Sequence, residues 1–270
     1  MYINYTKHQI YNDDIKEVVK TLKKGQLTQG KKVNELENAL NKKFKSKYCN
    51  VVSSGTAALH LAGKALGWSL NDVVITTPIT FLSTVNSIVY SGAKPLLVDV
   101  KASDSTLDPN ILEDKIKKLN KKVTSVIAVD FAGHPCDWKG LKYLSKKYSF
   151  SLINDNCHAL GAKYFNDPGY AVKYADLVTH SYHAAKNITT GEGGSVLTNN
   201  KFLYEKIRSL RSHGVNKNEK IDRKKGLWFY QMNCLGFNYR LPDLNCALGV
   251  SQLKKLDNFV KQRRKIAKIY

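Results

Sequence analysis

The chain has 270 residues, of which 43% are hydrophobic and 24% are charged, and its formal net charge is +21. This length and composition predict a globular protein with one large domain, or a large domain and part of a second. The first 14 residues form no apolar signal segment, and the longest apolar runs are far shorter than the ~20 residues that a membrane span needs, so we expect a cytoplasmic protein without a membrane partner.

The positive charge raises the question of nucleic-acid binding. The lysines occur in pairs along the whole chain, and no helix-turn-helix, RNP or zinc-finger pattern accompanies them. We therefore expect no nucleic-acid partner, although a basic anion-binding module remains an alternative that the charge alone supports. A positive field favours anionic small molecules such as nucleotide-linked or phosphorylated ligands. The five cysteines include no C-x-x-C pair, so we expect reduced thiols and no metal site.

Helical spacing covers residues 9–24 and 32–46, with a turn at residues 28–30 between them. From residue 48 onward, short apolar runs alternate with amphipathic ones. Further helices are expected over residues 56–66, 81–92, 108–120, 139–149 and most of 241–270. Strands are expected over residues 48–54, 72–77, 94–100, 124–132, 150–156, 175–182 and 193–199. This alternation predicts an α/β fold with a mostly parallel, seven-stranded sheet and helices on both faces.

Ligands of open parallel sheets bind beyond the carboxyl ends of the strands. At the first such end, the stretch SSGTAAL (residues 53–59) turns from a strand into a helix, which is typical of a phosphate-binding cup or of simple helix capping. At the second, Phe81 follows the strand over residues 72–77. This aromatic ring could stack on a flat ligand or belong to the core.

Two further strand ends carry ionisable groups. Asp155 closes a buried strand and His158 follows three residues later. A carboxylate there is costly unless it meets a cation or makes local hydrogen bonds. Lys186 follows the strand over residues 175–182 and precedes a glycine-rich turn. A lysine in such a place can form an imine with a carbonyl compound, whereas most lysines are solvated surface charges.

Together these features match the needs of pyridoxal phosphate, which requires a lysine for its aldehyde, a carboxylate for its ring nitrogen, a phosphate cup and an aromatic cover. Neither G-x-G-x-x-G after a strand nor G-x-x-x-x-G-K-[ST] occurs in the chain. The sequence therefore favours a pyridoxal-phosphate enzyme over a nucleotide-binding one.

The chain resembles the DegT/StrS-type sugar aminotransferases, which are pyridoxal-phosphate enzymes of fold type I. The similar motifs follow the family order over nearly the whole chain: LTQGKKVNELENAL, VVSSGTAALHLAGKALG, VVITTPITFLSTVNSI, GAKPLLVDV, INDNCHALGA, SYHAAKNITTGEGGSVLTNN, RSHGV and LGFNYRLPDLNCALGVSQLKKLD. Two motifs depart from the family pattern. Where the family usually has H-P-V-K, this chain has His183-Ala184-Ala185-Lys186. Where the family usually has a Glu-Asp pair, this chain has Asn154-Asp155.

The resemblance implies a role for individual residues. Lys186 would be the Schiff-base lysine and proton shuttle, and Asp155 would keep the pyridine nitrogen protonated. Phe81 would stack on the ring, and His158 would lie near its O3′ side. The phosphate would be held by Gly55, Thr56 and Ser181, with Asn238 reaching it from a neighbouring subunit of a homodimer. The segments expected to contact the nucleotide-sugar are Tyr5 and the loop Gly25, Gln26, Leu27 and Thr28.

The resemblance also implies a substrate and a domain plan. The motifs are most similar to the branch that transfers an amino group from L-glutamate to C4 of a UDP-linked 4-keto-6-deoxy-N-acetylhexosamine in the pseudaminic acid pathway, which serves flagellin glycosylation. Another nucleotide-sugar aminotransferase, of the perosamine or dTDP-sugar type, and a non-catalytic remnant remain alternatives. Residues 1–30 would form an N-terminal arm and substrate loop, and 31–250 the cofactor-binding large domain. Residues 251–270 would begin a helix leading to a C-terminal small domain that is largely missing.

Overall fold

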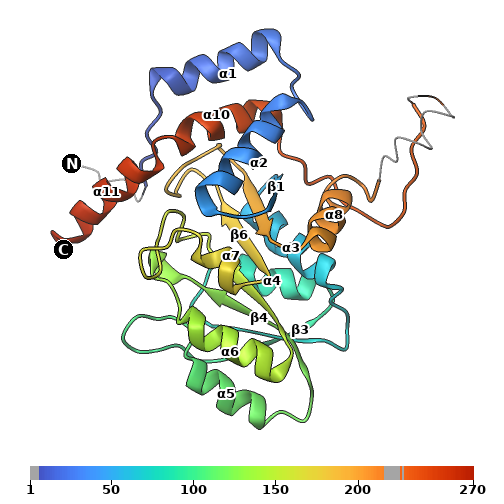
Figure 1. The fold of residues 1–270 in the computed structure, drawn as a ribbon, viewed down its shortest axis with the longest axis vertical. Helices are drawn as coiled ribbons and strands as arrows, with labels where there is room; N and C mark the ends of the chain where they lie inside the picture. Colours follow the sequence, from blue (N-terminus) through green and yellow to red (C-terminus); the bar gives the residue numbers. More distant parts are fainter. Residues whose placement is uncertain (1–5, 216–225, 227) are drawn as a thin grey trace.

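The computed structural model describes residues 6–215, 226 and 228–270 (Figure 1). Its single sheet consists of β1 (Tyr48–Val52), β2 (Val73–Thr76), β3 (Lys94–Leu97), β4 (Val123–Val129), β5 (Ser151–Asp155), β6 (Leu177–Ser181) and β7 (Gly194–Thr198). The strand order is β1-β7-β6-β5-β4-β2-β3. Strands β2 to β6 pair in parallel, and β7 runs antiparallel to both of its neighbours. The predicted seven-stranded, mostly parallel sheet is therefore confirmed.

Helices alternate with these strands. Those described are α1 (Asn12–Lys24), α2 (Lys31–Phe44), α3 (Gly55–Leu66), α4 (Leu82–Tyr90), α5 (Pro109–Lys117), α6 (Trp138–Tyr148), α7 (Tyr170–Tyr174), α8 (Lys201–Leu210), α10 (Asp243–Leu253) and α11 (Leu256–Ala267). Side chains satisfy free amide groups at several helix starts, as when Ser54 accepts from Ala57 N–H and Asp108 from Asn110 N–H. The helices expected after residue 241 are confirmed, and they are interrupted between α10 and α11.

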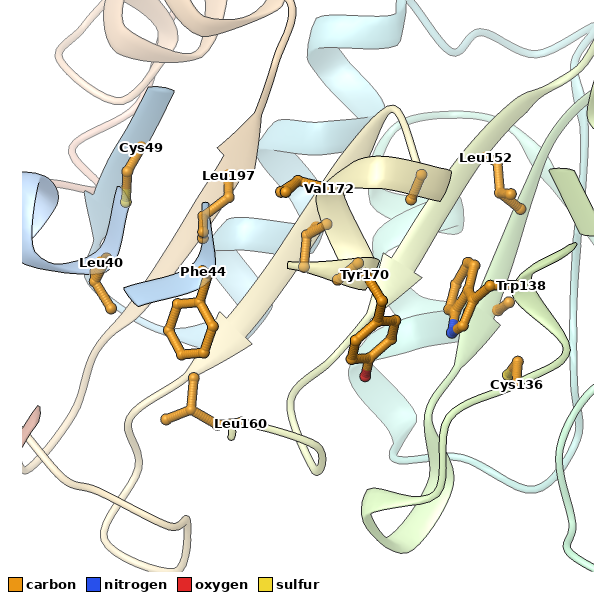
Figure 2. Packing of buried hydrophobic residues seen from close by; sticks show 14 of the residues in the cluster. Leu40, Phe44, Cys49, Cys136, Trp138, Leu152, Leu160, Tyr170, Val172 and Leu197 are labelled. Carbon is orange, nitrogen blue, oxygen red and sulfur yellow. The ribbon is translucent and has the colours of Figure 1, made fainter. Parts of the chain in front are cut away.

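Two hydrophobic clusters cover the two faces of the sheet. Adjacent residues of one strand point to opposite faces, so Val126 of β4 joins one cluster and Ile127 joins the other. The first cluster includes side chains of α2, α6, α7 and α11, and Figure 2 shows Phe44, Tyr170 and Trp138 along it. The second includes side chains of α3, α4 and α8. The prediction of helices on both faces is confirmed.

The parallel strands bring their carboxyl ends to one edge of the sheet, where β5 and β6 are neighbours. The hairpin connection between β6 and β7, residues 182–193, lies at the same edge, because β7 begins where β6 ends. Ser181 pairs with Gly194 across this hairpin. The helices of the described residues include no candidate membrane span.

Candidate active site

Asp155 is the last residue of β5 and is only 4% exposed. Its Oδ2 accepts a hydrogen bond from the Thr84 hydroxyl at 2.7 Å, and its Oδ1 accepts one from Cys157 N–H at 3.2 Å. The Thr84 hydroxyl also contacts the Thr80 hydroxyl at 2.7 Å. No salt bridge of the described residues includes Asp155. A buried carboxylate without a cation is costly, so this carboxylate is suited to a protonated ring nitrogen.

Lys186 lies in the β6–β7 hairpin connection and is half-buried. Its backbone N–H donates to the carbonyl of His183 at 2.9 Å, which closes a tight turn. The side chain lines a cavity of about 600 Å³ together with Cys157, His158 and Phe131. Burial and the nearby Lys186 ammonium lower the pKa of His158, so its imidazole is neutral at neutral pH. Lys186 and His158 thus face one cavity beside the β5 strand end.

The N-terminus of α3 lies against the hairpin. A Cβ atom at Gly55 would lie 2.8 Å from Cβ of Ser181 and 3.4 Å from Sγ of Cys157, so only glycine permits this approach. Ser54 accepts from Ala57 N–H and Ala58 N–H. Within the described part of the chain, the N–H groups of Gly55 and Thr56 have no acceptor, and free N–H groups at a helix start bind phosphate.

Phe81 precedes α4 directly and is 63% exposed. The Phe81 carbonyl accepts from Thr84 N–H at 3.1 Å. Phe81 therefore lies one helical turn from the Thr84 hydroxyl that contacts Asp155. Its ring is free to cover a ligand and takes no part in the core.

Other predicted site residues lie elsewhere. Asn238 is exposed and pairs with Ser212 in an isolated bridge. The exposed loop Gly25–Thr28 is held to α10, because the Leu27 carbonyl accepts from Asp243 N–H at 2.9 Å. Among the described contacts, none brings this loop or Asn238 to Lys186. Tyr5 lies outside the described residues.

Sequence reasoning missed a buried carboxylate behind the site. Asp130 is 0% exposed, and its Oδ2 accepts from the Tyr170 hydroxyl at 2.6 Å and from Asn156 Nδ2 at 2.8 Å. Burial raises the pKa of Asp130, while these donors favour its charged form. Because Asn156 follows Asp155, the Asp130 network fixes the chain just after the site carboxylate. Its sequence signal was an acidic residue directly after β4, one position beyond Val129, which pairs with Asp155 of β5.

These residues fit pyridoxal phosphate on three counts. Among the described residues, Asp155 is a buried anion without a cation, and α3 offers free amide N–H groups beside Ser181; Lys186 lines a cavity at the same edge of the sheet. A phosphate, a pyridine ring and an aldehyde need these partners.

Comparisons with known proteins agree with the site. The model of the DegT/DnrJ/EryC1/StrS aminotransferase family matches residues 8–270. The chain is 43% identical over 268 residues to the UDP-4-amino-4,6-dideoxy-N-acetyl-beta-L-altrosamine transaminase of Campylobacter jejuni (serotype O:2), covering 99% of this chain and 68% of that protein. The chain thus spans about two-thirds of the length of this relative.

Solved structures show the same likeness. Helicobacter pylori PseC, an aminotransferase involved in pseudaminic acid biosynthesis, has a TM-score of 0.86 and 35% identity, covering 94% of this chain and 66% of that one. The putative sugar aminotransferase Spr1654 of Streptococcus pneumoniae, solved in PMP and PLP forms, has TM-scores of 0.90 and 0.88 at 28% identity, with about 70% of its length covered. The chain therefore belongs to the DegT/DnrJ/EryC1/StrS family of pyridoxal-phosphate-dependent aminotransferases.

Proposed function

We propose that the chain uses pyridoxal phosphate to transfer an amino group from L-glutamate to C4 of a UDP-linked 4-keto-6-deoxy-N-acetylhexosamine, giving UDP-4-amino-4,6-dideoxy-N-acetyl-β-L-altrosamine. The observation that carries the cofactor part is the buried Asp155 carboxylate, which has hydrogen-bond donors but no cation among its described neighbours. The 43% identity to the Campylobacter transaminase supports the sugar and its nucleotide.

The residues would divide the work as follows. When bound, pyridoxal phosphate supplies an electrophilic carbonyl and an electron-accepting ring. Lys186 Nζ would hold the cofactor and move the proton during transfer, and Asp155 would keep the ring nitrogen protonated. The N–H groups of Gly55 and Thr56, with the Ser181 hydroxyl, would hold the phosphate. The phosphate oxygens would accept charge-assisted hydrogen bonds from these groups, and such bonds are stronger than hydrogen bonds between neutral groups.

The remaining predicted residues complete this proposal. Phe81 would cover the ring and exclude water, and neutral His158 would lie beside its O3′ side. Asn238 would reach the phosphate from a neighbouring subunit of a homodimer, and Tyr5 and the loop Gly25–Thr28 would contact the nucleotide-sugar. The exposure of Asn238 and of this loop is compatible with these roles. A cytoplasmic location and a part in flagellin glycosylation remain predictions.

The cofactor assignment is tested by adding pyridoxal phosphate to the chain and reducing with borohydride. We expect an absorbance band that reduction removes, and a peptide map with the cofactor fixed on Lys186. Lys186→Arg keeps the charge and should abolish the labelling, while Lys201→Arg on the exposed start of α8 is the matched control. Labelling spread over other lysines of a folded protein would contradict the assignment.

The substrate is tested with nitrogen-15-labelled L-glutamate and a panel of UDP-, GDP- and dTDP-linked 4-keto sugars. We expect the label at C4 of the UDP-linked N-acetylhexosamine, located by NMR of the product. Preferred amination of a GDP-linked sugar would instead favour a perosamine-type enzyme, in line with the 35% identity over 243 residues to the GDP-perosamine synthase of Escherichia coli O157:H7.

A further inference from the structure

Two cavities meet at Lys186. One, of about 580 Å³, lies between residues 6–9 and the hairpin connection, and the other, of about 600 Å³, lies beside His158. Both cavities are lined by Lys186, Asn187 and Arg263. The Arg263 side chain therefore borders the same space as the lysine expected to carry out the chemistry, although it comes from α11, 77 residues later in the chain.

Arg263 is placed by the packing of α11 and by the hairpin connection. Leu256 and Phe259 are buried in the core, and Arg263 follows Phe259 by one helical turn, on the same side of α11. Its Nη2 donates to the carbonyl of Lys186 at 3.1 Å and reaches the carbonyl of Ala185 at 3.5 Å. A guanidinium group has five N–H donors in a planar fork. Both contacts use one nitrogen, and within the described residues the other N–H groups of Arg263 make no further hydrogen bond, so they can bind a ligand.

The charged residues that line the cavity beside His158 are all basic. Its lining contains Lys186, Arg263 and Arg264 and, within the described part of the chain, no aspartate or glutamate. A concave site lined by cations concentrates anions, and a guanidinium binds a carboxylate through two parallel hydrogen bonds. A ligand with two carboxylates matches this site better than one with a single negative charge.

We propose that Arg263 binds a carboxylate of the dicarboxylate amino donor in the cavity beside His158, with Arg264 facing the second carboxylate. This inference rests on the proposed aminotransferase function. Because Arg263 contacts the backbone of Lys186 itself, a carboxylate held there lies next to the residue that handles the amino group. Binding energy at this carboxylate would then orient the donor for reaction.

The test is the affinity of the cofactor-loaded chain for glutarate, an unreactive dicarboxylate, measured by calorimetry at fixed ionic strength. We expect Arg263→Gln, which keeps N–H donors for the two carbonyls, to weaken glutarate binding at least tenfold. Arg263→Lys should give an intermediate affinity, because it keeps the charge and loses the planar fork. Butyrate, with one carboxylate, should bind more weakly than glutarate. Its affinity should also differ less between the wild type and Arg264→Gln than the affinity for glutarate does.

Lys265→Gln is the matched control, since it removes one charge from α11 outside both cavities that Lys186 lines. Unchanged glutarate affinity in Arg263→Gln would overturn the proposal, as would an equal loss in Lys265→Gln or no glutarate binding by the wild type. Borohydride labelling of Lys186, measured on each variant, reports on the cofactor independently. Intact labelling with unchanged glutarate affinity would reject the role of Arg263 and leave the proposed function standing.

Discussion

In the described part of the chain, Asp155 is held by one side-chain hydroxyl and one backbone N–H group, so its orientation depends on few contacts. Thr84 supplies the hydroxyl from the first turn of α4, on the neighbouring part of the sheet edge. It touches the carboxylate that would face the cofactor ring, and it acts as a positioning residue. Removing its hydroxyl leaves a buried charge with one partner fewer.

We therefore predict that Thr84→Val weakens the binding of pyridoxal phosphate. A hydrogen bond to a charged group contributes about 1.5–3 kcal/mol, which corresponds to a roughly ten- to hundredfold rise in the cofactor dissociation constant. Fluorescence titration of the apoprotein measures this constant. Thr84→Ser retains the hydroxyl and should bind nearly as well as the wild type, and equal losses in the two variants would argue against the hydrogen bond as the cause.

Single residues could be predicted where a local pattern marks them. Asp155 ends an apolar strand and Lys186 follows another, so strand recognition alone places them at one edge of the sheet. Thr84 and Arg263 act through tertiary contacts, with β5 and with the hairpin connection respectively. No local pattern distinguishes Arg263 from its basic neighbours on α11, so the sequence alone could not select it.

At the scale of elements, α2 contributes side chains to the first hydrophobic cluster at the end of the sheet where β1 and β7 pair antiparallel. Leu40 of α2 is 0% exposed, and Figure 2 shows it near Phe44, Cys49 and Leu197. The cluster surrounds the side chains of β1 and β7, next to the strand that leads to Lys186. The cost of a cavity here measures how much α2 contributes to the fold.

We expect Leu40→Ala to lower the free energy of unfolding by about 2–5 kcal/mol, the usual range for a buried leucine. Leu22→Ala on α1 is the control, because Leu22 is 58% exposed and its loss should change stability little. Urea unfolding followed by circular dichroism compares the variants. Equal stability of Leu40→Ala and the wild type would show that this part of the core collapses around the gap.

Elements with a strong periodic pattern, such as α2, α6 and β4, were predicted within a few residues. The five-residue α7 and the ten-residue α8 were not assigned, although α8 is amphipathic. The direction of β7 was not predicted either. It follows from the hairpin connection of residues 182–193, which is too short and too irregular to hold a crossover helix. Strand direction depends on that connection, and the strand residues themselves carry no such signal.

At the scale of the whole molecule, a buried histidine links stability to pH. His180 is 1% exposed, and burial lowers its pKa to about 3, from 6.5 in the unfolded chain. The unfolded chain therefore binds a proton that the folded protein excludes between these values. The stability associated with neutral His180 is complete above about pH 6.5 and is lost progressively as the pH falls toward 3.

We predict that His180→Gln has a shallower dependence of unfolding free energy on pH between 6.5 and 4.5. One excluded proton corresponds to a slope of about 1.4 kcal/mol per pH unit, and the difference between the two proteins should approach that value. Chemical unfolding at a series of pH values gives both slopes. Parallel slopes would mean that His180 is protonated in the folded protein.

The proposed homodimer makes a separate prediction for mixed subunits. If Asn238 serves the partner's site, Asn238→Ala should reduce borohydride labelling of Lys186 at limiting cofactor. Adding excess Lys186→Ala chains, which retain Asn238, should restore labelling on a tagged Asn238→Ala chain. No recovery after subunit exchange, checked by sedimentation, would contradict a site shared between subunits.

The reversal at β7 has a consequence for how the site can change during evolution. Ser181 and Lys186 are separated by four residues of one continuous connection, with no helix between them. The distance along the backbone between the proposed phosphate contact, Ser181, and the proposed reactive amine of Lys186 is therefore fixed by chain length. An insertion of even one residue there would put the two groups out of register, whereas insertions in loops away from this edge would not. We therefore expect the number of residues between Ser181 and Lys186 to stay constant as the sequence evolves.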